Sequence, residues 1–152
     1  MKPRAKAAVP EPEREALDAV AAVYRDLAAR PVTRACTLRT ECCRFQLTGM
    51  VPYLTRGEAL VAARALRRTG RVKAPSRDDG ACPLLDGDGR CLVYESRPFG
   101  CRTHFCSTAG GPYQRTEVLD LIRRLEEIDA RLGGDGPRPL PDALVRALRE
   151  IE

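Results

Sequence analysis

The chain has 152 residues, which suits a single domain, and its 26 Lys and Arg residues against 21 Asp and Glu give a formal net charge of +5. Four thiolates around a +2 metal would lower that charge by about 2, so nucleic-acid binding is permitted but not indicated. No apolar run approaches the ~18 residues of a transmembrane helix, and no apolar stretch follows the basic N-terminus as in a signal peptide. The composition therefore predicts a cytoplasmic protein with no membrane segment.

The N-terminal stretch, residues 1–12, is rich in Pro, Lys and Ala and is expected to be disordered. After it, apolar residues recur at helical spacing in three stretches, and a capping box marks the start of a further helix between the first two of them. The capping box is Thr55-Arg-Gly-Glu58, and Gly70 ends its helix, while Gly133-Gly134 ends the next one. Periodicity and capping together predict helices over residues 13–30, 55–69, 116–132 and 141–151.

These helices flank a cysteine-rich centre, and the sequence shows no internal repeat. We therefore expect residues 13–152 to form one domain whose core is the segment 36–106. The predicted fold class is mainly α with a small β-hairpin, an α+β domain in which the helices pack around or beside a bound metal.

The central segment holds seven cysteines, whereas the flanks have none and the whole chain has a single histidine. Cysteines of this kind could be small core residues, and one or two of them are expected to be. A disulfide framework is disfavoured because cytoplasmic thiols stay reduced and because seven is an odd number. Soft thiolates gathered in one segment instead indicate a zinc or iron–sulfur site. The candidate ligands are Cys36, Cys42, Cys43, Cys82, Cys91, Cys101 and Cys106.

The stretch from Cys82 to Tyr94 predicts a hairpin, because Asp86-Gly-Asp-Gly89 separates two apolar runs. With a turn centred on Gly87-Asp88, Leu84 faces Cys91. Cys82 shares a sheet face with Leu84, since side chains alternate along a strand. Cys82 and Cys91 are then diagonal neighbours, close enough to share one metal or cluster.

The next stretch continues from Ser96-Arg-Pro98, a plausible helix start, to Cys101, His104 and Cys106. In a short helix Cys101 and His104 share a face as i and i+3. A lone histidine is more often a core or surface residue than a ligand, so His104 is the weaker candidate. The flanking arginines favour the Cys101 thiolate.

Three blocks of this region resemble the YkgJ-type cysteine-cluster family, whose pattern is CxxCxxCC and which is described as a zinc- or iron-chelating domain. The blocks are Cys36-Thr-Leu-Arg-Thr-Glu-Cys42-Cys43, then Cys82-Pro-Leu-Leu-Asp, then Cys91-Leu-Val-Tyr-Glu-Ser-Arg-Pro-Phe-Gly-Cys101-Arg. The resemblance covers roughly residues 36–106 and implies a bacterial-type metal-chelating domain without a defined activity. A flagellin lysine methylase similar to this family carries an iron–sulfur cluster, which implies that cofactor as an option.

The chain departs from the family pattern at its second cysteine, where it has Arg39. Cys106 lies beyond the pattern and could substitute as a ligand. Neighbouring side chains usually point apart, so we expect one of Cys42 and Cys43 to be a ligand while the other packs or binds a second metal. Seven thiols and His104 could fill two four-ligand sites, but one site with spare cysteines is simpler.

Three kinds of function remain open from the sequence. The first is a metal-chelating module with a structural metal and a surface that binds a protein partner. The second is a redox or metal-responsive protein with an accessible cluster, and the third is a metal-dependent enzyme. Evidence for an enzyme is thin, because the sequence shows no phosphate-binding loop and no serine-based triad. The resemblance to the cysteine-cluster family slightly favours an iron–sulfur cluster, with zinc nearly level, and the sequence indicates no substrate, partner or oligomeric state.

Overall fold

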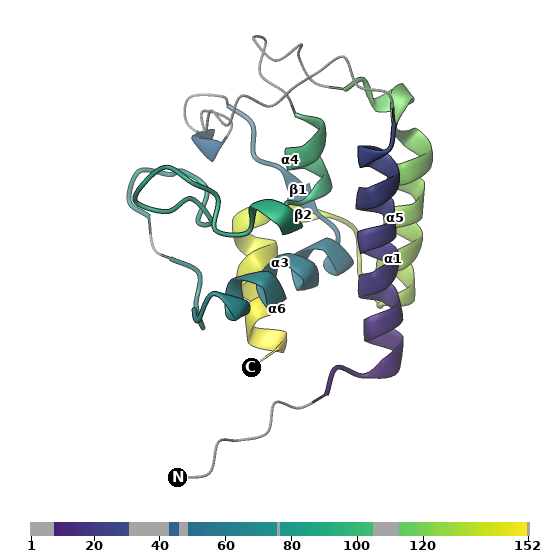
Figure 1. Ribbon diagram of the computed structural model, residues 1–152, viewed down its shortest axis with the longest axis horizontal. Helices are drawn as coiled ribbons and strands as arrows, with labels where there is room; N and C mark the ends of the chain where they lie inside the picture. The colour runs from purple at the N-terminus through teal and green to yellow at the C-terminus, as the bar shows by residue number, and fades with distance from the viewer. Residues whose placement is uncertain (1–7, 31–42, 46–48, 76, 105–112, 152) are drawn as a thin grey trace.

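The computed structural model describes residues 8–30, 43–45, 49–75, 77–104 and 113–151 (Figure 1). Helices dominate the described part, and its β-structure consists of two short strands and one isolated bridge, so the predicted fold class is confirmed. The elements in chain order are α1 (Glu11–Ala28), β1 (Tyr53–Leu54), α3 (Arg56–Arg68), the 3-10 helix η2 (Tyr94–Ser96), α4 (Phe99–Thr103), the 3-10 helix η4 (Arg115–Glu117), α5 (Leu119–Arg131), β2 (Arg138–Pro139) and α6 (Leu140–Glu150). No described helix is long and apolar enough to cross a membrane.

The four predicted helices are present, with small shifts at their ends. Helix α1 begins at Glu11 because Pro12 fits its first turn, where no backbone N–H is needed. Glu11 and Pro12 therefore belong to a helix and not to a disordered N-terminus. Residues 115–117 form the 3-10 turn η4, so α5 begins at Leu119, three residues later than predicted.

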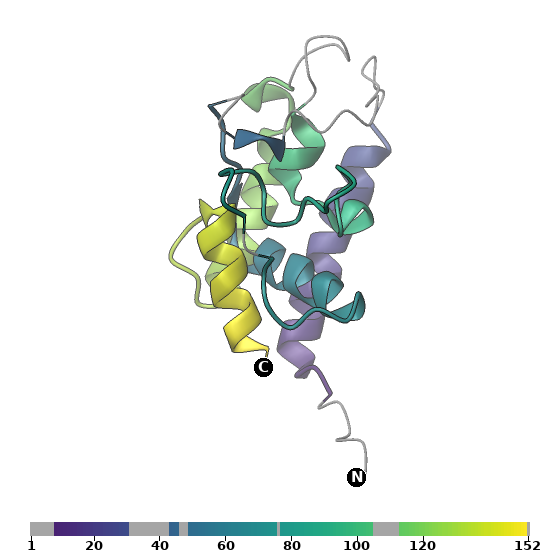
Figure 2. The same ribbon diagram turned by 90° about the vertical axis from the view of Figure 1, so that its left-hand side faces the viewer.

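One half of the core lies between α1 and α5, which run side by side in Figures 1 and 2. Val20 and Val23 of α1 are fully buried there, against Leu121 and Leu125 of α5. Helix α3 begins close to this pair. A Cβ on Gly57 would lie 2.9 Å from Val20 Cγ2 and 3.2 Å from Ile128 Cγ2, so glycine allows α3 to approach both helices.

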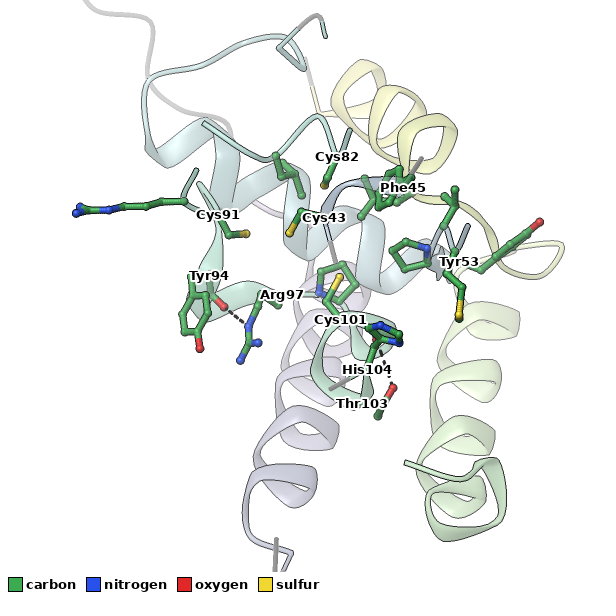
Figure 3. Close-up of a pocket in the computed structure, with 18 of the residues that line it drawn as sticks. Cys43, Phe45, Tyr53, Cys82, Cys91, Tyr94, Arg97, Cys101, Thr103 and His104 are labelled. Carbon is green, nitrogen blue, oxygen red and sulfur yellow. Dashed lines mark hydrogen bonds between the residues drawn. The ribbon is translucent and has the colours of Figure 1, made fainter. Parts of the chain in front are cut away.

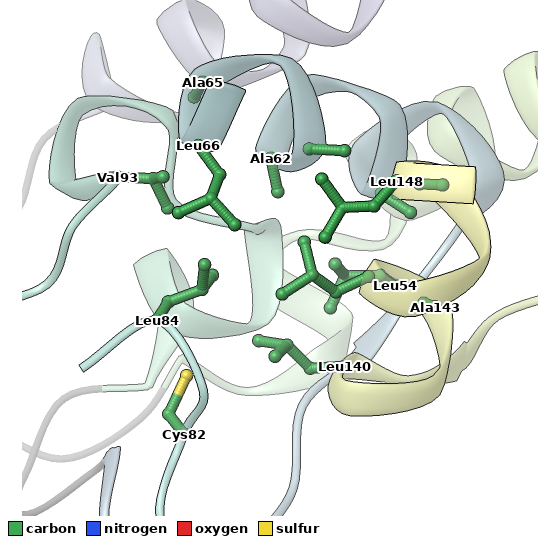
Figure 4. Packing of buried hydrophobic residues seen from close by; sticks show 14 of the residues in the cluster. Leu54, Ala62, Ala65, Leu66, Cys82, Leu84, Val93, Leu140, Ala143 and Leu148 are labelled. Carbon is green, nitrogen blue, oxygen red and sulfur yellow. The ribbon is translucent and has the colours of Figure 1, made fainter. Parts of the chain in front are cut away.

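The other half of the core lies between α3, α6 and the cysteine-rich segment (Figure 4). Leu66 of α3 and Leu144 of α6 have no exposed surface, and Leu84 is 1% exposed. Cys82 belongs to this cluster and is 5% exposed. The cluster therefore supports the segment that carries Cys82.

A two-stranded antiparallel sheet joins distant parts of the chain, with Tyr53 opposite Pro139 and Leu54 opposite Arg138. Leu140 N also donates to Pro52 O at 2.9 Å, which links the start of α6 to β1. The sequence did not predict this sheet, because two residues per strand are too few to show an alternating pattern.

The predicted hairpin at 82–92 is present, but its register was wrong by one residue. Leu85 pairs with Cys91, and Asp86 N donates to Arg90 O at 2.8 Å, so the loop has three residues rather than two. Gly89 has a φ of +79°, the left-handed conformation that such a three-residue loop uses. Leu85 N also donates to Cys82 O at 3.0 Å, which makes 82–85 a turn and not the extended strand that the alternation argument assumed.

Candidate metal centre

Four of the predicted ligands line one cavity of about 950 Å³. Figure 3 shows the side chains of Cys43, Cys82, Cys91 and Cys101 entering this space from different sides. Leu84, Pro98 and other apolar side chains make up much of the wall, and the strongly exposed Met50 and Tyr53 lie on the lining as well, so the cavity opens to solvent. Thiols that are far apart in sequence therefore share one largely apolar site.

Cys43 and Cys82 are joined through their backbones, because Cys82 N donates to Cys43 O at 2.7 Å. The turn that leads to Cys82 is held by Arg77, whose Nη1 donates to Leu85 O at 2.7 Å. Arg77 also binds Asp79 through Nε at 3.0 Å and Nη2 at 2.7 Å. The two hydrogen bonds between Arg77 and Asp79 shift the pKa values of both side chains. They lower the pKa of Asp79 and raise the pKa of Arg77. The nearby Cys82 and Cys43 also raise the pKa of Arg77.

The hairpin loop holds Cys91 in place. Asp86 Oδ1 accepts from Asp88 N at 2.9 Å and from Arg90 N at 2.8 Å, so the Asp86 side chain closes the three-residue loop. Leu92 N donates to Leu84 O at 2.8 Å on the far side of the bridge. The aspartate is thus a turn residue, and its role here is to fix the strand that carries Cys91.

Helix α4 carries Cys101 to the cavity. It begins at Phe99 after the buried Pro98 and not near Ser96, because residues 94–96 form the separate turn η2. Gly100 packs closely on Pro52, where a Cβ would lie 3.2 Å from Pro52 Cβ. His104 is the residue that ends the helix, and it lines the same cavity as Cys101.

Arg102 of α4 binds the turn that precedes this helix. Its Nε donates to Arg97 O at 2.6 Å and its Nη2 to Glu95 O at 2.8 Å, while its guanidinium lies 4.1 Å from the centroid of the Tyr24 ring. Burial lowers the pKa of Arg102, and the neighbouring Cys101 opposes this shift. That these arginines favour the Cys101 thiolate stays a prediction from the sequence.

The sequence indicated Glu58 as a helix cap but not as a neighbour of the cysteine-bearing helix. Its carboxylate accepts from Thr55 N and Thr55 Oγ1, both at 3.0 Å, and from Phe99 N at 2.8 Å. Tyr24 Oη donates to the same carboxylate at 3.3 Å. Burial raises the pKa of Glu58, against the effect of these hydrogen bonds, and burial together with the Glu58 carboxylate raises the pKa of Tyr24.

The remaining predicted ligands, Cys36, Cys42 and Cys106, lie outside the described residues. Within the described ranges, no three His, Cys, Asp or Glu side chains form a group that could hold a metal ion. The four described thiols therefore line one cavity, but no three of them are placed to bind a single metal ion. The residue types still suit a soft metal, because four thiols in a largely apolar wall are the donor set of zinc–thiolate and iron–sulfur sites.

The comparisons with known proteins agree with this donor set. The sequence profile of the CxxCxxCC family, described as "Putative zinc- or iron-chelating domain", matches residues 33–120, more than half of the chain. The chain belongs to the CxxCxxCC family. Its members are described as chelating zinc or iron, and all seven cysteines lie in the matched region. Searches of curated proteins and of solved structures found no match.

His104→Ala tests the one imidazole at this site. We expect the variant to keep its metal and lose little stability, because His104 is half-buried at the end of a short helix and thiolates supply the soft donors. Metal content per chain and a thermal melt of the purified variant are the measurements. Complete loss of metal would show that the imidazole is a ligand.

Proposed function

We propose that this CxxCxxCC-family chain binds an iron–sulfur cluster, with Cys43, Cys82, Cys91 and Cys101 as the first candidates for its ligands. The observation that carries the proposal is that all four line one cavity. A single zinc ion needs four donors within about 2.3 Å of one point. A cluster has several metal atoms, so its thiolates stand around a larger volume, as the described thiols do.

The surroundings of the four thiols support the same proposal. Clusters are held by cysteine thiolates, and their potentials depend on burial, net charge and nearby hydrogen-bond donors. Cys82 is buried, the wall is largely apolar, and Arg77 and Arg102 place positive charge near the thiols. When bound, a cluster would supply one-electron transfer, which fits a redox or metal-responsive protein better than a purely structural module. Zinc is the alternative, since the family is described as chelating either metal.

Alkylation of cysteines tests which thiols hold the metal. Protein purified without oxygen is treated with iodoacetamide before and after its metal is removed by a chelator, and the modified cysteines are identified by mass spectrometry. We expect Cys43, Cys91 and Cys101, which are half-buried, to be protected in the metal-bound protein and to react once the metal is gone. Cys82 is shielded by the core and is expected to react slowly in both states.

The alkylation result separates ligands from neighbours. Equal reactivity of Cys43, Cys91 and Cys101 with and without metal would contradict the proposed ligand set. Metal-dependent protection of Cys36, Cys42 or Cys106 would add those residues to it, and total thiol content in denaturant provides the control for oxidation.

A further inference from the structure

Two charged side chains in the described part of the chain are buried, Glu58 at 2% and Asp129 at 4% exposed. Each carboxylate binds two backbone N–H groups, one on each oxygen. Glu58 Oε2 accepts from Thr55 N at 3.0 Å and Oε1 from Phe99 N at 2.8 Å. Asp129 Oδ1 accepts from Arg56 N at 2.8 Å and Oδ2 from Gly136 N at 3.0 Å. The two residues are alike in chemistry but hold different segments together.

Glu58 differs from Asp129 in what it connects to the cysteine cavity. Phe99 is the first residue of α4, and Cys101 lies two residues further along this helix of five residues. A helix so short has few hydrogen bonds of its own, so its position depends on tertiary contacts. The Glu58 carboxylate supplies one such contact from α3, and the Tyr24 hydroxyl ties α1 to the same oxygen.

Within the residues that the structure describes, Asp129 has no such connection. Its carboxylate joins the start of α3 to the loop at Gly136, and it lines a smaller, separate cavity of about 300 Å³. None of the four described cysteines lines that cavity. Both carboxylates brace the N-terminus of α3, but Glu58 alone of this pair reaches α4.

We propose that Glu58 is the positioning residue of the metal centre, and that it holds the Cys101 helix against α3 and α1 through the Phe99 N–H. This inference rests on the proposed metal site. A carboxylate is required, because each of its oxygens accepts from a backbone N–H, whereas an amide would present a donor to one of them.

Tyr24 and Arg102 extend this support. The Tyr24 hydroxyl reaches Glu58 Oε1, while its ring lies under the Arg102 guanidinium that binds Arg97 O and Glu95 O. Helix α4 is therefore held near its start by Glu58 and at Arg102 by contacts with the turn before it. If the hydrogen bond between Glu58 and Phe99 is lost, we expect the position of Cys101 to be less well fixed, although its thiol is still present.

The test compares Glu58→Gln with Asp129→Asn, which make the same chemical change at the two buried carboxylates. Each variant is purified without oxygen, and metal release to an excess of chelator is timed under conditions where circular dichroism shows full folding. A ferrous-iron chelator is used for iron, or a zinc chelator if the wild type carries zinc. We expect release from Glu58→Gln to be about tenfold faster than from wild type, from the loss of one buried hydrogen bond, and release from Asp129→Asn to match wild type.

Tyr24→Phe is the second variant, for the case in which Glu58→Gln does not fold. It removes one donor to Glu58 Oε1 and keeps the ring beneath Arg102, so we expect normal folding and a smaller acceleration of metal release. Equal release rates in wild type, Tyr24→Phe and any folded Glu58→Gln would overturn the inference. Equal acceleration in Glu58→Gln and Asp129→Asn would also overturn it, because it would mean that general destabilisation is the cause. A wild-type protein without metal would instead contradict the proposed function.

Discussion

Replacing Cys82 by serine is expected to remove the bound metal and the soluble fold together. Cys82 lines the cavity and also lies within the apolar core, so its replacement by serine affects both the site and the packing. Serine is a poor ligand for a soft metal, and its hydroxyl would be buried beside Leu84, where an unsatisfied polar group costs about 1–3 kcal/mol. Metal binding also contributes directly to the free energy of folding, so its loss destabilises the domain further.

Cys82→Ala separates the two effects. Alanine removes the ligand without burying a hydroxyl, so metal content should fall as far as in Cys82→Ser while the melting temperature falls less. Metal analysis per chain and thermal melts of both variants are the measurements. A wild-type melting curve with full metal content in either variant would show that Cys82 is a core residue and not a ligand.

Replacing Leu66 by alanine is expected to lower the free energy of unfolding by about 2–5 kcal/mol. Leu66 has no exposed surface and packs in the cluster that also contains Leu84, Val93 and Leu148 (Figure 4). Truncation removes buried methyl groups and leaves a cavity that the surrounding helices can fill only in part.

Val145→Ala on α6 is the matched control, because Val145 is 39% exposed. It should change the free energy of unfolding by less than about 0.5 kcal/mol. Denaturant unfolding of metal-loaded wild type and both variants provides the comparison. A loss at Leu66 no larger than that at Val145 would mean that α3 does not pack against the hairpin segment and α6 as described.

The helices were predictable because their signals are local. The apolar spacing in α1, α5 and α6 and the capping box at Thr55, which marks the start of α3, each involve only a few neighbouring residues. The tight turn at Asp86–Gly89 was equally visible. Its register was not, because two-residue and three-residue loops differ by the conformation of Gly89, which the sequence does not reveal.

Contacts between distant segments could not be predicted in this way. The pairing of Tyr53 with Pro139 and the bond from Phe99 N to Glu58 join positions 86 and 41 residues apart, and neither leaves a pattern along the chain. The grouping of cysteines in one segment did indicate a shared site. Which cysteines share the site depends on the backbone hydrogen bond between Cys82 and Cys43 and on the position of α4. Tertiary packing determines both.

The most direct measurement is an absorption spectrum of the protein purified without oxygen, together with iron, zinc and acid-labile sulfide analysis of the same sample. An iron–sulfur cluster predicts a brown protein that absorbs near ~400 nm and contains iron and sulfide. A colourless protein with stoichiometric zinc and no sulfide would contradict the cluster and leave a zinc-chelating module. A sample with neither metal would contradict the metal centre itself.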